Sequence, residues 1–218
     1  MTPETTVFIV DDDPGVRDSL QRLLQSVGLK SEVYASAPEF LAGYDPDSPG
    51  CLLLDLRLPG MSGLELQQRL AAEDVTLPIL IITGYGDVPS AVHAMKSGAA
   101  DFIEKPFNKQ GLLEKIQRAV ATDEQLRQAC ERRAAIAARR DRLTPRELEV
   151  MRRVVSGQAN KVIAIELGIS KKTVEVHRAR VMKKMGVRTV ADLVRAEVVV
   201  EENVASSDTE AETAFGPA

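Results

Sequence analysis

Acidic residues follow directly after two short apolar runs in the first quarter of the chain. The run Thr6 to Val10 leads into Asp11 and Asp12, and the run Cys51 to Leu54 leads into Asp55. Continuous apolar runs of this length are typical of strands buried on both faces of a parallel sheet. Ligands bind outside the carboxyl ends of such strands, so the pattern places these three acids for chemistry. A strand-ending aspartate by itself would be interpreted as an ordinary turn residue.

Two further polar residues are expected at the same edge of the sheet. Thr83 ends the apolar run that begins at Leu77, and Lys105 follows the run from Ala100 to Glu104. Three carboxylates roughly 4 Å to 6 Å apart repel one another by a few kcal/mol per pair, so the cluster requires a cation. Mg²⁺ prefers such oxygen ligands and binds phosphoryl oxygens as well. The sequence therefore predicts an aspartate that attacks a phosphoryl donor, while metal, lysine and hydroxyl hold the negative charge.

Apolar runs alternate with helical patterns through the first part of the chain. Leucines at helical spacing follow the first apolar run, for example Leu20, Leu23 and Leu24 before Gly28. This alternation predicts an α/β domain with a doubly wound five-stranded parallel sheet. The expected strands are residues 6–10, 31–35, 51–54, 77–83 and 100–104.

The second part of the chain has the pattern of four short helices. A capping box at residues 144–147 starts the first, Gly168 and Ser170 separate the second from the third, and Thr189 opens the fourth. Two short helices joined by a tight glycine turn are typical of a helix-turn-helix. We therefore expect an all-α domain that follows the α/β domain.

A segment without Gly or Pro connects the two predicted domains. Its composition between Gly111 and Pro145 favours one long helix or a helix followed by a helical linker. Because its apolar seam is thin, we expect a solvated, partly frayed connector rather than a coiled coil. The predicted organisation is an α/β domain at 1–121, a helical linker at 122–142, a helix-turn-helix domain at 143–200 and a disordered acidic tail at 201–218.

Charge is divided unevenly along the 218 residues, whose net charge is −4. Residues 1–138 carry −7, residues 139–200 carry +8 and residues 201–218 carry −5. An acidic module followed by a basic one is expected when the second meets a polyanion. No apolar run approaches a membrane span and the N-terminus lacks a signal pattern, so we expect a cytoplasmic protein with no membrane partner.

These motifs resemble those of bacterial two-component response regulators. The first domain resembles the receiver domain, which implies a flavodoxin-like fold, and the second resembles the LuxR/FixJ effector, closest to the FixJ subfamily. The similarity covers about residues 5–200 and includes several motifs in the right order. The motifs are VDDD at 10–13, DLRLPGMSG at 55–63, ITGYGD at 82–87, DFIEKPF at 101–107, LTPRELEVM at 143–151 and ISKKTVEVHRARVMKKM at 169–185.

The resemblance implies a role for each receiver residue. Asp55 would be the phosphoacceptor, Lys105 would pair with the phosphoryl group, and Thr83 and Phe102 would form the switch pair. The implied partners are a sensor histidine kinase, promoter DNA, RNA polymerase and, on phosphorylation, a second copy of the chain. Such a protein is not an enzyme beyond catalysing its own phosphorylation and dephosphorylation. The implied Mg²⁺ ligands are Asp12, Asp55 and the backbone carbonyl of Arg57, with Asp11 acting through water.

The third helix of the basic domain separates into a buried and an outward face. Val174, Val181 and Met185 recur at helical spacing and are expected to be buried. The outward face of the second helix of a helix-turn-helix enters the major groove, and flanking cations neutralise phosphates. The predicted contacts are Glu175, Val176 and Ala179 at base edges, with Lys171, Lys172, Thr173, Arg178 and Lys183 around them.

Three alternatives stay open at this point. Haloacid-dehalogenase-type phosphatases also use a strand-end aspartate, although their later acidic pair is missing here and they would not explain the basic half. A receiver that takes no phosphate would serve a phosphorylation-independent DNA-binding regulator as a dimerisation or docking scaffold. Leu193 and Val194 suit either an effector dimer contact or the core of the domain.

Overall fold

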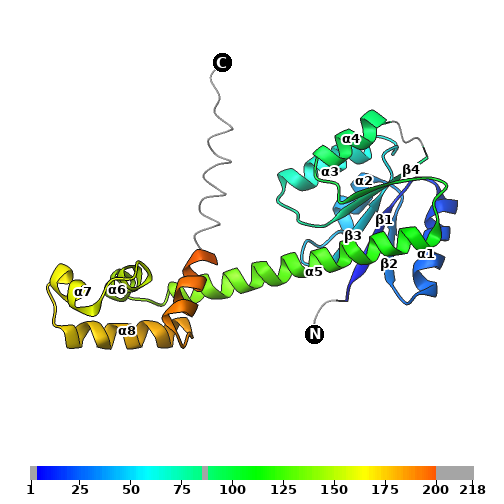
Figure 1. Ribbon diagram of the computed structural model, residues 1–218. Coiled ribbons are helices and arrows are strands. Elements are labelled where there is room, and N and C mark those ends of the chain that lie inside the picture. The colour runs from blue at the N-terminus through cyan, green and yellow to red at the C-terminus, as the bar shows by residue number, and fades with distance from the viewer. Residues whose placement is uncertain (1–3, 85–87, 200–218) are drawn as a thin grey trace, which may run out of the picture. The chain divides into compact units, whose positions relative to one another are not determined.

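The computed structural model describes residues 4–84 and 88–199. It divides the chain into two compact units, residues 1–128 and residues 129–218, whose elements are shown in Figure 1. The tail predicted to be disordered, residues 201–218, lies outside the described residues. Within the described part, no helix combines the length and apolarity that a membrane crossing requires.

The first unit is built on a five-stranded sheet of order β2-β1-β3-β4-β5, in which every pairing is parallel. This confirms the predicted doubly wound α/β fold, whose order is that of flavodoxin-like proteins. The strand beginning at Leu77 is shorter than predicted, because its paired residues start after Pro78, which has no N–H to donate. The strands are β1 Thr6–Val10, β2 Lys30–Tyr34, β3 Gly50–Leu54, β4 Ile79–Thr83 and β5 Asp101–Glu104.

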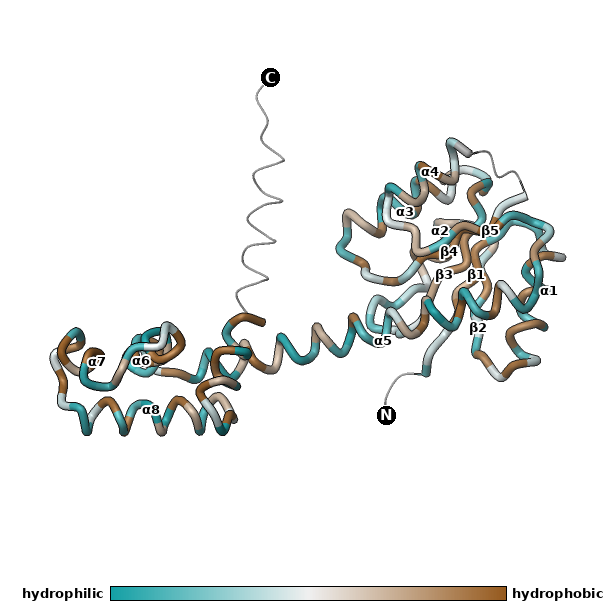
Figure 2. Tube along the Cα trace, viewed as in Figure 1, coloured by the Kyte–Doolittle hydropathy of each residue, from teal (hydrophilic) through white to brown (hydrophobic). Residues whose placement is uncertain are grey.

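Helices cover both faces of the sheet, so the central strands are apolar apart from one threonine at the start of β1 and one at the end of β4. Successive residues of β1 point to opposite faces: Phe8 packs on the side of α2, α3 and α4, whereas Ile9 packs on the side of α1 and α5. Figure 2 shows the resulting hydrophobic centre at β1, β3 and β4. Burial on both faces explains why these strands were visible in the sequence. The helices are α1 Pro14–Ser26, α2 Ala37–Gly43, α3 Gly63–Ala72, α4 Val88–Lys96 and α5 Lys109–Arg140.

Helix α5 continues without interruption through the predicted linker as far as Arg140. Asp123 is 1% exposed and accepts a hydrogen bond of 2.8 Å from the backbone N–H of Gly50. Arg127 pairs with Asp123 at 2.9 Å and donates to the carbonyls of residues 46–48. The expectation of a frayed connector is therefore wrong, because the helix is continuous and polar side chains attach its start to the first unit. The expected solvation is found at residues 128–135, which are exposed.

The second unit contains the predicted helices around its own core. They are α6 Pro145–Val155, α7 Asn160–Leu167, α8 Lys171–Met185 and a fourth helical stretch at residues 190–199, orange in Figure 1. Ile136, from the last turns of α5, also packs on this core. Leu193 is 1% exposed within it, so of the two interpretations left open for Leu193 the structure supports a residue of the core.

Candidate functional site

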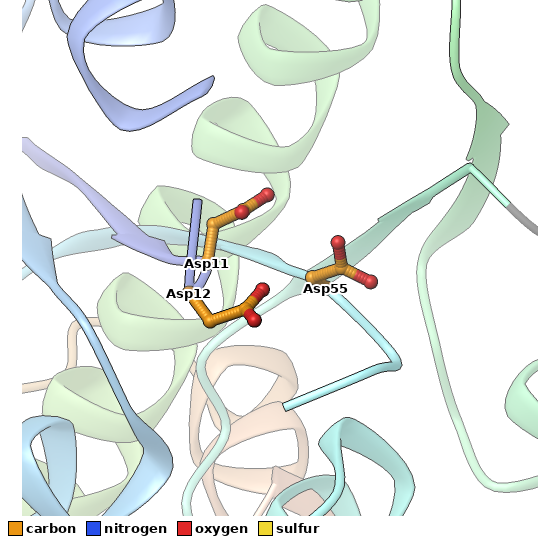
Figure 3. A group of neighbouring side chains, drawn as sticks. All are labelled: Asp11, Asp12 and Asp55. Carbon is orange, nitrogen blue, oxygen red and sulfur yellow. The ribbon is translucent and has the colours of Figure 1, made fainter. Parts of the chain in front are cut away.

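Three carboxylates converge at the carboxyl edge of the sheet. β1 and β3 are neighbours in register, with Val10 opposite Leu54, so Asp11, Asp12 and Asp55 leave the two strands together. One oxygen of each lies within 4.8 Å of the others. Figure 3 shows the Asp12 carboxylate pointing toward Asp55. Asp11 and Asp55 are buried, whereas Asp12 is exposed to a ligand from solvent.

The turn between β1 and α1 holds the first two acids in place. Asp13 caps α1 by accepting a 2.7 Å hydrogen bond from the N–H of Gly15. Its own backbone N–H donates to Oδ1 of Asp11 at 2.9 Å, and Arg17 donates to the carbonyl of Asp11 at 2.6 Å. The helix cap therefore also orients the Asp11 side chain.

The loop after β3 folds back over Asp55. The backbone N–H of Arg57 donates to Oδ1 of Asp55 at 3.0 Å. Gly63 approaches so closely that a Cβ at this position would lie 2.2 Å from the carbonyl oxygen of Asp55. Only glycine fits such an approach, so Gly63 is a positioning residue that the sequence showed only as the end of a motif.

Lys105 connects two of the carboxylates. Its Nζ lies 2.6 Å from Oδ2 of Asp11 and 2.6 Å from Oδ2 of Asp55. Burial would lower the pKa of Lys105, but its hydrogen bonds to both acids outweigh burial and raise that pKa. Burial raises the pKa of Asp11 above its ordinary value although Lys105 opposes the shift. One lysine charge thus stands beside three carboxylates and pairs with two of them, and this set of oxygen donors fits a further cation such as Mg²⁺.

The predicted switch residues lie on the two strands beyond β3. Thr83, at the end of β4, is 1% exposed, and the backbone N–H of Lys105 donates to its carbonyl at 2.8 Å. Phe102, on β5, is half-buried against the core beneath α2, α3 and α4. Residues 85–87, which belong to one of the motifs quoted above, lie outside the described residues.

In the second unit, α7 and α8 meet at a sharp turn. Gly168 ends α7 with a left-handed φ of 64°, and Ser170 caps α8 by accepting from the N–H of Thr173. The predicted buried face of α8 is confirmed, since Val174, Val181 and Met185 are each at most 1% exposed. The opposite side presents exposed residues for an external partner: Lys171, Lys172, Glu175, Val176, Ala179 and Lys183.

Two cations of α8 have partners on other elements of the unit. Arg178 donates to Oδ1 of Asn160 at 2.6 Å and ties α8 to the start of α7. Lys184 lies 2.6 Å from the buried carboxylate of Glu147 and 2.9 Å from the carbonyl of Arg142. The hydrogen bond from Lys184, followed by that from the backbone of Thr144, lowers the pKa of Glu147 to about 2. The capping box identified Glu147 in the sequence, but nothing local indicated its lysine partner.

A flavodoxin-like sheet with acids after β1 and β3 and a lysine after β5, followed by a helix-turn-helix unit, defines a DNA-binding regulator with a receiver domain. Residues 7–117 match the response regulator receiver domain, and residues 141–196 match the luxR family of bacterial regulatory proteins. The chain belongs to the response regulators that carry a LuxR-type DNA-binding domain. The resemblance seen in the sequence is thereby confirmed.

Relatives and solved structures match nearly the whole chain. It is 46% identical to nodulation protein W of Bradyrhizobium diazoefficiens, over 87% of this chain and 83% of that protein. The transcriptional regulatory protein FixJ of the same organism is 44% identical over 89% of this chain and 95% of its own length. The structure of the response regulator StyR aligns with a TM-score of 0.82 at 44% identity, covering 91% of this chain and 99% of that one. Full-length FixJ from B. japonicum aligns with a TM-score of 0.56 at 42% identity, over 92% and 99%.

Proposed function

We propose that this response regulator accepts a phosphoryl group on Asp55 from a sensor histidine kinase and then binds promoter DNA as a dimer. The observation that carries the proposal is the position of Asp55. Its carboxylate is buried at a strand end, 2.6 Å from Lys105 and within 4.8 Å of two further acids. A carboxylate placed in this way is a nucleophile with its charge-stabilising groups already assembled.

The transfer is an in-line exchange of bonds at phosphorus. An oxygen of Asp55 attacks the phosphorus of a phosphohistidine, the new O–P bond forms as the P–N bond breaks, and the histidine keeps the electron pair and takes up a proton. Lys105 pairs with one phosphoryl oxygen and the hydroxyl of Thr83 donates to another. Asp11, Asp12, Asp55 and the Arg57 carbonyl would hold Mg²⁺, which supplies neutralisation of the phosphoryl charge when bound.

Phosphorylation is proposed to act as a population shift in the receiver. Movement of Thr83 toward the phosphoryl group leaves room for Phe102 to turn inward, which remodels the face formed by α4 and β5. Val92 and Met95 on α4 are 45% and 46% exposed, and an ion pair between Asp101 and Lys115 lies on β5 and α5. Exposed apolar side chains near a polar pair suit the interface of a homodimer.

Two paired copies would bring two α8 helices to the DNA. The proposed base contacts are Glu175, Val176 and Ala179, of which Val176 is 44% exposed. Arg178 uses one of its five N–H donors on Asn160, which leaves the others for a phosphate. Once one α8 helix of the dimer is bound to its DNA half-site, the other is held at a high effective concentration near the second half-site, which raises the affinity. RNA polymerase is the proposed downstream partner, and the cytoplasm, where promoter DNA is found, the proposed location.

The test is the intact mass and solution size of the protein with Mg²⁺ and a small-molecule phosphodonor. We expect one added phosphoryl group and a shift from monomer to dimer, both absent in Asp55→Asn. Asp18→Asn is the matched control, because Asp18 is an exposed aspartate of α1 outside the acid cluster. No adduct in the unmodified chain, even with candidate kinases, would contradict the proposal and favour a receiver that acts as a scaffold.

A further inference from the structure

An open groove of about 590 Å³ lies in the second unit, between the last turns of α5 and the helical residues 190–199. Its walls are apolar and include Ile136, Val194 and Val198, the last of which is 47% exposed. This volume is in the range of sites that accept a ligand or several side chains of a peptide. The groove lies on a different surface from the outward side of α8, because its lining includes only Met185 of that helix.

The rim of the groove is cationic. Arg132, Arg139 and Arg195 line it, with Asp192 as the single acid among the lining residues, so the net charge is +2. Asp192 is already paired with Arg195 at 3.0 Å. Within the described part of the chain, no carboxylate pairs with Arg132 or Arg139. An occupant with both carboxylates and apolar side chains would therefore complement the groove.

The chain itself carries such a segment a short distance in sequence after the last residue that lines the groove. Val199 lines the groove, and residues 201–218 follow it with five acids and no Lys or Arg. The same segment holds Phe215, the single aromatic residue after Phe107. We propose that residues 201–218 dock into the groove of their own chain, with carboxylates on the arginines and Phe215 against the apolar wall.

Reach and charge both favour this occupant. Phe215 is 16 positions beyond Val199, and an extended chain of that length spans about 50 Å, which is ample for a return to the groove. A tethered segment also has an effective concentration on the order of millimolar. A second copy would bring another cationic rim, and like charges oppose that contact. The docked segment covers Val194 and Val198, so it restricts association of two copies through this surface.

A tryptophan at position 215 tests the proposal in the full-length protein, because the chain contains no other tryptophan. We expect the emission of Phe215→Trp to be shifted to shorter wavelength than that of a free peptide of residues 201–218 with the same substitution. Quenching by iodide should be reduced severalfold, and both effects should be independent of protein concentration. Adding Arg132→Glu should return the emission to that of the free peptide.

Arg133→Glu is the matched control, since Arg133 is the next residue, is also exposed and does not line the groove. It should leave the emission unchanged. If Phe215→Trp alone had the same emission as the free peptide, the proposal would be overturned. It would also be overturned if Arg132→Glu and Arg133→Glu changed the emission equally. A signal that disappears on dilution would show binding to a neighbouring copy and would overturn docking in the same chain. None of these results depends on phosphorylation of Asp55, so the proposed function is tested separately.

Discussion

Two lysines, one in each unit, contact buried carboxylates at the same distance and in different surroundings. Lys105 lies 2.6 Å from both Asp11 and Asp55, with Asp12 close by. Lys184 lies 2.6 Å from Glu147 alone. The first lysine is shared by a surplus of acids, whereas the second is matched one to one with an acid that also closes a helix capping box.

The pKa values follow this difference. Burial raises the pKa of Asp11 above its ordinary value; the hydrogen bond from Lys105 opposes this shift without cancelling it, and the charge of Asp55 adds a smaller rise. The hydrogen bond from Lys184 lowers the pKa of Glu147 to about 2. The cluster around Lys105 has more carboxylates than cations, so it can bind another cation and react. The pair of Lys184 and Glu147 has one charge of each sign, so it serves to hold α8 against α6.

The largest expected effect comes from removing the matched lysine. Lys184→Met leaves the Glu147 carboxylate buried without its cation, which should lower the free energy of unfolding of the second unit by about 3 kcal/mol. Urea denaturation followed by NMR signals of that unit measures the change. Lys183→Met is the matched control, because Lys183 is the preceding exposed residue, and it should stay within about 0.5 kcal/mol. Equal behaviour of the two variants would show that the pair is not structural.

Addition of Mg²⁺ should stabilise the unit that contains the acid cluster and not the unit that contains the Lys184–Glu147 pair. At a concentration about 100 times the dissociation constant, Mg²⁺ should stabilise the first unit by about 2.7 kcal/mol and leave the second unit unaffected. Asp12→Asn should weaken Mg²⁺ affinity at least tenfold by calorimetry, because it removes one of three converging carboxylates. Asp18→Asn should not change the affinity. Equal affinities in the two variants would remove Asp12 from the proposed ligands.

Lowering the pH should reduce the contribution of the Lys184–Glu147 pair to the stability of the second unit. The pKa of Glu147 is lower in the folded protein, about 2, than its ordinary value of 4.5, so the unfolded state binds more protons between these values. The contribution of Glu147 is therefore full above about pH 4.5 and is lost as the pH falls toward 2; it is on the order of 1–3 kcal/mol. Unfolding of the second unit, measured from pH 6 downward, should show this loss. The same slope in Lys184→Met would assign it to other groups.

The smallest effect is expected on the outward side of α8. Lys183→Gln removes one proposed phosphate contact, so DNA affinity should fall a fewfold and the slope of log K against log salt should decrease by about one. Fluorescence anisotropy with promoter DNA at several salt concentrations measures both quantities. An unchanged slope would place Lys183 away from the phosphates. The contrast between Lys183 as a DNA contact and Lys184 as a structural residue would then lose its first half.

Local signals made much of the fold and the acid cluster predictable. The residues of β1 and β3 are all buried, so their apolar runs were unbroken and the acids after them were conspicuous. The capping boxes at Ser62 and Thr144 are also local, because cap and partner are three residues apart. The parallel arrangement then follows from the alternation of strands and helices, and it brings the strand ends together.

The sequence by itself thus determined which segments form the strands of the sheet and the helices of the second unit, where the acids stand and which face of α8 is buried. Only the tertiary structure decided which charges are neutralised. Asp123 meets Gly50 across 73 positions, Lys184 meets Glu147 across 37 and Arg178 meets Asn160 across 18. In the sequence Asp123, Lys184 and Arg178 all look like solvated charges on helices. Their partners come from elements brought close by packing of the core, and a periodic pattern read along one helix carries no information about what packs against it.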